Sequence, residues 1–247
     1  MKSFNLLILL SLSSPVHAQT ESVIESIDSN QPITITNLDT RESHSAVTDE
    51  SLPTRFQIKT PTDSSVRIKM SDESEVTVGS ESQLTFDHTD SKPLVNLEQG
   101  EVHANIAHAD TTTLQAPHKF FLQTQKNATF GVRGTELHLS SSATQPTEMH
   151  TLSGVVDASD NVENLKKGKG QPIEANHSIS HNGKSFDGVK KFDRAQFLQK
   201  LKQRQPRMHS LQAKRSRKFQ HLKQQRMKRN RPARAHRPME HQRRKRR

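Results

Sequence analysis

Histidine is the residue type here with the clearest capacity for metal chemistry, because 14 of the 247 residues are histidines. A zinc site needs three or four convergent ligands. Two pairs have a spacing that one strand or helical turn could bring together: His103 with His108, and His177 with His181. Neither pair comes with the further ligands that a zinc site needs, and no acidic residue supports the second. We therefore expect neither a metal site nor a bound cofactor.

Catalytic signatures are equally scarce. The sequence has no glycine-rich phosphate loop, no HExxH motif and no paired carboxylates. Ser153 precedes Gly154 but lacks the first glycine of a nucleophile elbow, so it is better interpreted as a turn residue. The absence of Cys excludes disulfides and thiol chemistry, and the absence of Trp and Tyr removes the usual stacking platforms for sugars and bases. The sequence predicts a protein that is not an enzyme.

Charge divides the chain into two parts. Lys and Arg number 37 against 26 Asp and Glu, and residues 190–247 hold 23 of the basic residues and only 2 of the acidic ones. Residues 1–189 have 14 basic and 24 acidic residues. The chain therefore has an acidic body and a basic tail.

The first 18 residues have the pattern of a secretory signal peptide. Lys2 supplies a positive charge, 4–12 is an almost unbroken apolar run, and small residues favour cleavage after Ala18. The apolar run is too short to span a bilayer, which needs about 20 residues. We expect a periplasmic or secreted protein with no integral membrane segment after cleavage.

The mature chain changes character at about residue 55. Residues 19–54 are acidic and poor in apolar side chains, which predicts a flexible arm with one short strand at 33–36. Short runs of alternating apolar residues then continue to about 160 and predict a single all-β domain over 55–160. Residues 161–189 are expected to form an irregular extension.

A weak internal echo indicates how these strands are arranged. Residues 97–104 and 151–158 share Gly, Val and Ala at equal offsets. Similar strand-turn-strand units that stack in a coiled, β-helix-like domain could bury a narrow core with the few large side chains available.

Three stretches resemble the FecR-like periplasmic domain of ferric-citrate-type signalling regulators. Residues 65–84 resemble the opening of that domain, 94–102 resemble its Leu-x-x-Gly-x-Val centre, and 128–139 with 152–156 are similar to its Val-x-Gly-Thr signature and closing strand. The resemblance covers about 65–158. The residues that carry the family motif, each expected to have a structural role, are Gly100, Gly131, Gly134, Thr135 and Gly154.

The resemblance implies a coiled all-β domain that acts by contact with an envelope protein. Family regulators that pass a signal inward have an anti-sigma segment and a transmembrane helix before this domain, where this chain has a cleavable signal. A basic tail also replaces the module that often contacts the transporter. A role in iron uptake or sigma-factor signalling therefore does not transfer with the motif.

The tail 190–247 is predicted to be partly helical and otherwise disordered. Asp193 is placed to cap a helix, Pro206 ends or kinks it, and a cluster of prolines follows. Polycations bind polyanions by releasing condensed counterions, which needs charge density alone. The candidate anion-binding residues are Lys214, Arg215, Arg217, Lys218, Arg226, Lys228, Arg229, Arg231, Arg243, Arg244, Lys245, Arg246 and Arg247.

Two functions follow from these patterns. The first is an exported envelope protein whose β domain binds a protein partner while the tail attaches to an anionic surface or polymer. The alternative is a polyanion-binding or nucleic-acid-binding protein that acts mainly through its tail. In either case the tail could instead be neutralised by the acidic body of its own chain.

Overall fold

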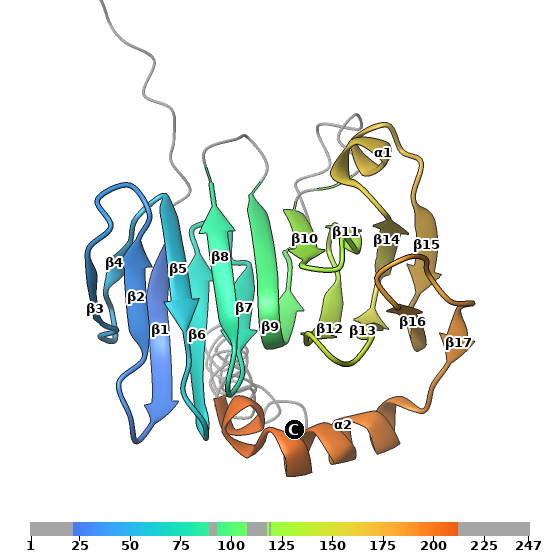
Figure 1. Cartoon of the computed structure of the whole chain (residues 1–247). Coiled ribbons are helices and arrows are strands. Elements are labelled where there is room, and N and C mark those ends of the chain that lie inside the picture. Colours follow the sequence, from blue (N-terminus) through green and yellow to red (C-terminus); the bar gives the residue numbers. More distant parts are fainter. Residues whose placement is uncertain (1–21, 89–92, 108–117, 119, 212–247) are drawn as a thin grey trace, which may run out of the picture. The chain divides into compact units, whose positions relative to one another are not determined.

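The computed structural model describes residues 22–88, 93–107, 118 and 120–211. The expectation of an all-β protein is confirmed (Figure 1). The strands are β1 (Ser22–Ser29), β2 (Thr34–Asn37), β3 (Ser43–Ser45), β4 (Ser51–Leu52), β5 (Arg55–Lys59), β6 (Ser64–Met70), β7 (Glu75–Val78), β8 (Gln83–Asp87), β9 (Leu94–Asn105), β10 (Phe120–Thr124), β11 (Thr129–Val132), β12 (Glu136–Ser141), β13 (Thr147–Ser153), β14 (Val155–Ser159), β15 (Gln171–Glu174), β16 (His177–His181) and β17 (Lys190–Lys191). The helices are α1 (Val162–Lys166) and α2 (Arg194–Arg204).

These strands form two sheets, which share β9. Sheet A runs in the order β4, β1, β6, β7, β9, β12, β13, β16, β17. Sheet B runs in the order β3, β2, β5, β8, β9, β10, β11, β14, β15. All these pairs are antiparallel except β9 with β10, which are parallel.

The long strand β9 changes sheets halfway along its length. Its first half pairs with β8 and β10, and its second half, from Gly100, pairs with β7 and β12. At the change Gly100 has a φ of 99°, and a Cβ on it would lie 2.1 Å from Ser82 Oγ. Only glycine fits this bend without strain, because its φ is positive and the backbone of Ser82 approaches closely.

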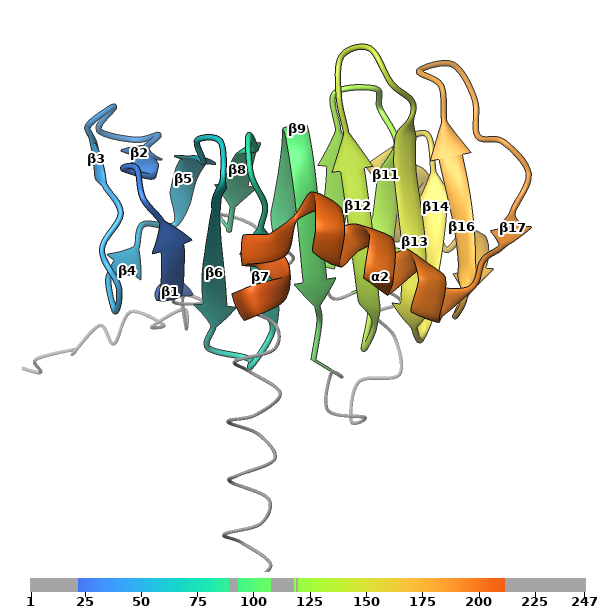
Figure 2. The ribbon, with the colours of Figure 1, turned by 90° about the horizontal axis from the view of Figure 1, so that it is seen from below.

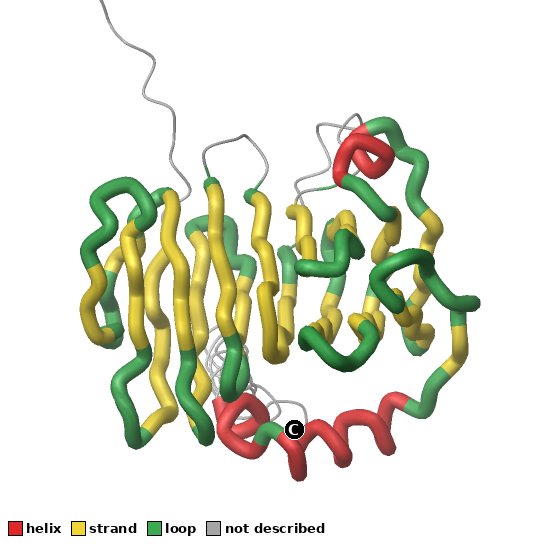
Figure 3. The backbone as a smooth tube through the Cα atoms, in the orientation of Figure 1, coloured by secondary structure: helices red, strands yellow, loops and turns green. Residues whose placement is uncertain are grey.

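The chain winds back and forth between the sheets, as the tube in Figure 3 shows. The hairpin of β6 and β7 lies in sheet A, β10 and β11 lie in sheet B, β12 and β13 return to sheet A, and β14 and β15 return to sheet B. This is the coiled arrangement that the internal echo predicts.

The core lies between the inner faces of the two sheets. Alternate side chains point inward, so that Phe56, Leu84, Phe86, Val95 and Val102 are completely buried. The rings of Phe56 and Phe86 stack on neighbouring strands with their centroids 4.6 Å apart. The alternation of apolar residues that predicted the strands therefore also places the side chains that fill the core.

The expectation of a flexible arm at 19–54 is wrong for residues 22–52. This segment forms four strands, and β1 pairs along most of its length with β6. Three of its few apolar residues belong to the core: Ile24, Ile33 and Ile35 are at most 2% exposed. Acidic composition did not prevent folding, because the acids stay out of the core: Glu25 and Asp28 are partly exposed on β1, and the other described acids lie in turns and loops.

Residues 161–189 also differ from the irregular extension that we expected. They contain α1, β15 and β16, and they add one further strand to sheet B and one to sheet A. A few isolated apolar residues are again sufficient to hold the segment in the fold, since Leu165, Ile173 and Ile179 are each buried.

Each sheet ends in a short strand. Sheet A ends at β4 and β17, which have two residues each. Sheet B ends at β3, whose three residues are all exposed, and at β15, which contains Pro172. Proline and short length both limit the backbone groups that an edge can offer to another chain.

We expect Ile24→Ala to lower the free energy of unfolding by about 2–5 kcal/mol, because it removes a fully buried side chain from the core. Val47→Ala is the matched control, since Val47 lies in the same segment but is 61% exposed, and it should change stability by less than about 0.5 kcal/mol. Urea denaturation followed by circular dichroism measures both. Equal, small effects would contradict the folded N-terminal segment.

Gly100→Ala should cost about 3 kcal/mol, because the positive φ and the clash with Ser82 add together. Gly168→Ala is the control: Gly168 also has a positive φ, of 68°, but nothing lies within 4 Å of its Cβ position. Its substitution should cost about 1 kcal/mol. The same denaturation experiment compares the two variants, and a Gly100→Ala cost no larger than that of Gly168→Ala would show that the close approach is unimportant.

Candidate functional site

The motif residues of the sequence lie where the chain crosses between the sheets. Gly134 and Thr135 connect β11 in sheet B to β12 in sheet A, and Gly154 connects β13 in sheet A to β14 in sheet B. The two crossings touch, because the Thr135 hydroxyl donates a 2.9 Å hydrogen bond to the Val155 carbonyl. A Cβ on Gly154, whose φ is 79°, would lie 2.8 Å from the Gly134 carbonyl oxygen.

Gly131 has a different environment. It lies in β11 opposite Asp157 of β14, beneath the ring of His118. His118 is only 2% exposed, and its Nε2 is 2.7 Å from Asp157 Oδ2. The five motif residues therefore shape the backbone at separate points and do not converge on one pocket.

A line of polar residues crosses the outer face of sheet A. Arg67, Thr77, His103, His138 and His150 are direct neighbours on β6, β7, β9, β12 and β13. The residues flanking them on each strand point into the core, so these five point outward. His103, His138 and His150 thus form a row of three histidines on adjacent strands, which we call the histidine row.

The histidine row is covered by residues 190–211, which we call the strap. Figure 2 shows α2, the main part of the strap, lying across β7, β9, β12 and β13. Phe197 of α2 stacks on the ring of His150 at 4.1 Å and contacts His138 edge-on at 5.4 Å. Phe192, just before the helix, packs edge-on against His150 at 4.9 Å.

The predicted start of this helix is confirmed. Asp193 is its N-cap and accepts a 2.9 Å hydrogen bond from the Gln196 N–H. The helix ends at Arg204, and residues 206–211 are helical again after the break at Gln205. The predicted effect of Pro206 is therefore also observed.

Two glutamates of sheet A connect the histidine row to arginines of α2. Glu136 lies 3.1 Å from His103 Nε2 and 3.0 Å from an Arg194 nitrogen. Glu101 lies 3.2 Å from His138 Nε2 and 2.9 Å from Arg204 Nε. Each carboxylate therefore bridges one histidine and one arginine.

The C-terminal end of the strap is held more deeply. Leu201, Met208 and Leu211 are almost completely buried, although none belongs to the core between the sheets. Gln205 accepts a 3.0 Å hydrogen bond from the Ser80 N–H, and a Cβ on Gly79 would lie 2.6 Å from Met208.

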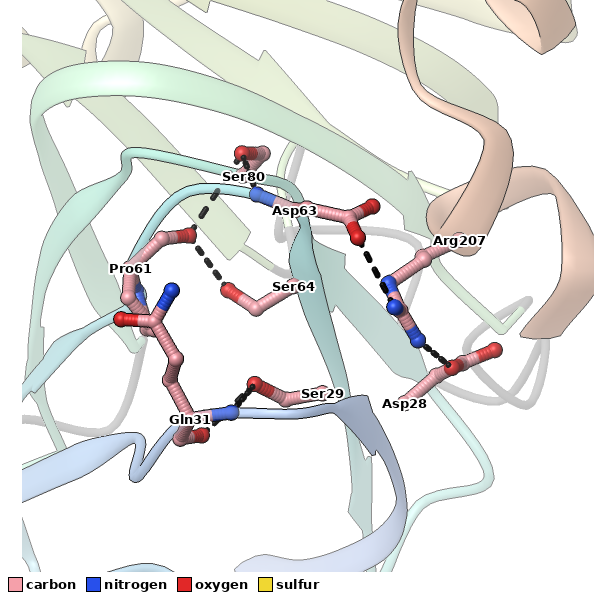
Figure 4. Close-up of polar contacts among 8 residues, drawn as sticks. All are labelled: Asp28, Ser29, Gln31, Pro61, Asp63, Ser64, Ser80 and Arg207. Carbon is pink, nitrogen blue, oxygen red and sulfur yellow. Dashed lines mark hydrogen bonds and ion pairs between the residues drawn. The ribbon is translucent and has the colours of Figure 1, made fainter.

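An arginine completes this anchor. Arg207 donates to Asp28 at 2.7 Å and to Asp63 at 2.8 Å, so it joins β1 to the loop before β6 (Figure 4). The hydrogen bond from Arg207 lowers the pKa of Asp63. The strap therefore also holds in place the N-terminal strand that composition alone had indicated to be flexible.

Burial governs the titration of His138 and His150 in the histidine row. It lowers the pKa of His138, and together with the positive charges of His138 and Arg204 it lowers the pKa of His150 to about 4. Burial opposes the ionisation of Glu101, but the hydrogen bond and charge of His138, with Arg204, outweigh it and lower the pKa of that carboxyl group. At neutral pH His138 and His150 are therefore uncharged beside an ionised Glu101.

The outer face of sheet B carries uncharged polar side chains. Thr36, Gln57, Thr85, Asn96 and Gln123 are neighbours in one line across β2, β5, β8, β9 and β10. All five are partly exposed. Toward the other end of this sheet, α1 contacts β11 and β14.

A polar cavity of about 610 Å³ opens at the C-terminal end of α2. Its walls include Gly100, Glu101, Arg204 and Gln205, and the remaining lining consists mostly of serine, glutamine and glutamate side chains. Such a lining suits a small polar group of a partner better than an apolar ligand.

The site was only partly visible in the sequence. The sequence pairs His103 with His108, which lies outside the described residues. In the structure His103 instead neighbours His138, and His138 neighbours His150. His177 and His181 lie on β16, where His177 pairs with Lys191 at the start of the strap and His181 Nε2 is 3.3 Å from Asp160. All thirteen candidate anion-binding residues of the tail, from Lys214 to Arg247, and the predicted signal peptide lie outside the described residues.

In the described part of the chain, no group of three or more His, Asp or Glu side chains is arranged to hold a metal ion. Neither described helix is long and apolar enough to cross a membrane.

Comparison with known proteins identifies the domain. Residues 56–157 match the sequence profile of the family described as FecR protein. This part of the chain matches the FecR family, as the motifs around Gly100, Gly134 and Gly154 predicted. No curated protein matches the chain.

Among solved structures, the chain is similar to two crystal structures of a candidate anti-sigma factor from Parabacteroides distasonis ATCC 8503. Both share 15% identity with this chain and cover 56% of it, with TM-scores of 0.45 and 0.44. The aligned regions span 61% and 60% of those chains.

We expect Leu201→Ala to loosen the strap without unfolding the sheets, because Leu201 is buried outside the main core. A loss of about 2 kcal/mol or more would lower the hydrogen-exchange protection of 192–211 roughly 30-fold. Leu198→Ala, on the same helix but only half-buried, should have a smaller effect. Protection lost equally in the strap and in β9 would mean that the strap does not open separately.

Proposed function

We propose that this chain is an exported protein of the bacterial envelope whose FecR domain binds a protein partner without catalysing a reaction. The FecR match over 56–157 is the observation that supports this proposal. The motif residues Gly100, Gly134, Thr135 and Gly154 serve the crossings between the sheets, which is a structural use and not a chemical one. Export and the periplasmic or secreted location rest on the predicted signal peptide.

The outer face of sheet B is the surface that we propose for the protein partner. Its line of threonine, glutamine and asparagine side chains offers hydrogen-bond donors and acceptors, and Glu98 beside the line accepts hydrogen bonds from Gln57 and Thr85. Sheet A is less suited while the strap covers its histidine row. A partner bound on sheet B could therefore associate without displacing any described element.

The part of the tail that follows the strap, residues 212–247, is proposed to attach the protein to an anionic surface or polymer. Residues 212–247 carry 16 Lys and Arg against one Glu. Neutralisation by the acidic body already applies to the strap, where Arg194, Arg204 and Arg207 pair with four carboxylates. None of these three arginines is among the candidate anion-binding residues, so the charge proposed for binding is separate from the charge that holds the strap.

A chain shortened to residues 19–211 should lose polyanion binding. It keeps the strap but lacks residues 212–247, which hold all the candidate anion-binding residues. We expect 19–247 to bind lipopolysaccharide and duplex DNA in fluorescence anisotropy. If six to ten cations engage phosphates, its affinity should fall roughly 10³- to 10⁵-fold between about 50 and 200 mM salt. Equal binding and equal salt dependence for both chains would contradict a role of the tail.

The same pair of chains separates the two candidate functions. If the FecR domain is the main binding module, a partner found by crosslinking in the envelope should bind 19–211 as well as 19–247. If the protein acts mainly as a polyanion-binding or nucleic-acid-binding protein, deleting 212–247 should abolish all its binding.

A further inference from the structure

The groups around the histidine row disfavour the protonation of His150. His138 and His103 each have a glutamate partner, Glu101 and Glu136, but His150 makes no ion pair with a described carboxylate. Its ring contacts both Phe192 and Phe197, which also contact one another. A charged imidazolium here would be desolvated without a counterion, which is costly.

The hydrogen bonding of the row also fits neutral rings. Nε2 of His138 is 3.2 Å from a Glu101 oxygen, so this nitrogen is the one that donates. Nδ1 of His138 and Nδ1 of His150 are buried and have no hydrogen-bond partner among the described residues. A second proton on either ring would create a buried N–H group without an acceptor.

The charges that face the row come from both the sheet and the strap. Glu101, Glu136 and His103 belong to sheet A, and Arg194 and Arg204 belong to α2. The lysines of β17 lie at the edge of sheet A. Lys190 pairs with Ser178 of β16, and Ser178 pairs in turn with His150. Arg204 repels a positive charge on His138 or His150, whereas Glu101, which already bridges Arg204, attracts one on His138 alone.

The side chains that hold the strap lie outside the core between the sheets. Leu201 is the only residue of α2 that is fully buried, and the residues that anchor the strap lie outside the main core. The connection from β16 contains Gly183, with a φ of 95°, and Gly188, which has nothing within 4 Å of its Cβ position. Val189 beside it is exposed.

We propose that the strap is an acid-released cover: protonation of His138 and His150 lifts α2 from sheet A and exposes the histidine row while the two sheets stay paired. This device is independent of the function proposed above. It would give the domain a second binding face, of histidine and glutamate, that is available only in acid.

The direction of the pH dependence follows from the histidines. His150 has an ordinary pKa of 6.5 when the strap is open and about 4 when it is closed, and burial shifts His138 in the same direction. A histidine with a lowered pKa stabilises the closed state fully above about pH 6.5, and this contribution is lost as the pH falls toward 4. His150 alone would reduce the closed population relative to the open one roughly 50- to 100-fold between pH 7.5 and 4.5.

Hydrogen exchange of the mature chain tests this proposal. Protection factors of peptides covering 192–204 should fall by that amount between pH 7.5 and 4.5, while those of β9 should stay constant. His150→Phe keeps the aromatic packing and removes the titrating group, so it should flatten most of the pH dependence, and adding His138→Gln should remove the rest. His88→Phe is the matched control, because burial also lowers the pKa of His88, which stacks with Phe86 of sheet B, and it should leave the strap unchanged.

A second measurement uses fluorescence and therefore needs no correction for the pH dependence of hydrogen exchange. The chain contains no Trp or Tyr, so Phe197→Trp supplies a single reporter stacked on His150. Its fluorescence should change between pH 6.5 and 4, and His150→Phe in the same background should suppress the change. A strap that stays protected at pH 4.5 would overturn the proposal, and so would strap and β9 peptides that lose protection together.

Discussion

A single strand that belongs to two sheets is the constraint on which the remaining structure depends. Because β9 leaves sheet B and enters sheet A at Gly100, the inner faces of the two sheets are fixed to one another at the middle of the domain. The hairpins on either side must then alternate between the sheets to continue both. The crossings at Gly134 and Gly154 are consequences of this alternation, and their contact through Thr135 fixes the distance between successive units.

The folded unit is larger than the FecR domain at its centre. Four strands precede residue 56, and β15 to β17 with the strap follow residue 157. These additions are not independent, since Arg207 of the strap binds Asp28 of the first strand. The two outer faces therefore differ. Sheet A needs a cover because its line of residues includes three histidines and a buried arginine, whereas the uncharged line on sheet B is compatible with water.

Sequence patterns predicted those features that depend on near neighbours. The alternation around Phe56 and Leu84 gave the strands, and Asp193 gave the start of α2, because period and capping are local properties. Strand β1 could not be predicted, since Ile24 is one of few apolar residues in an acidic segment and gains its burial from β6. The histidine row was invisible for a similar reason: strand pairing alone places His103, His138 and His150 side by side.

The short edge strands determine how far this architecture can extend. A coil of stacked units has two ends, and each would present open backbone groups to another molecule and so seed linear polymerisation. Here β3, β4 and β17 are too short to act as templates, and Pro172 removes one donor from β15. Within the described residues the coil is thereby terminated at both ends, which lets a repetitive β architecture exist as a discrete particle.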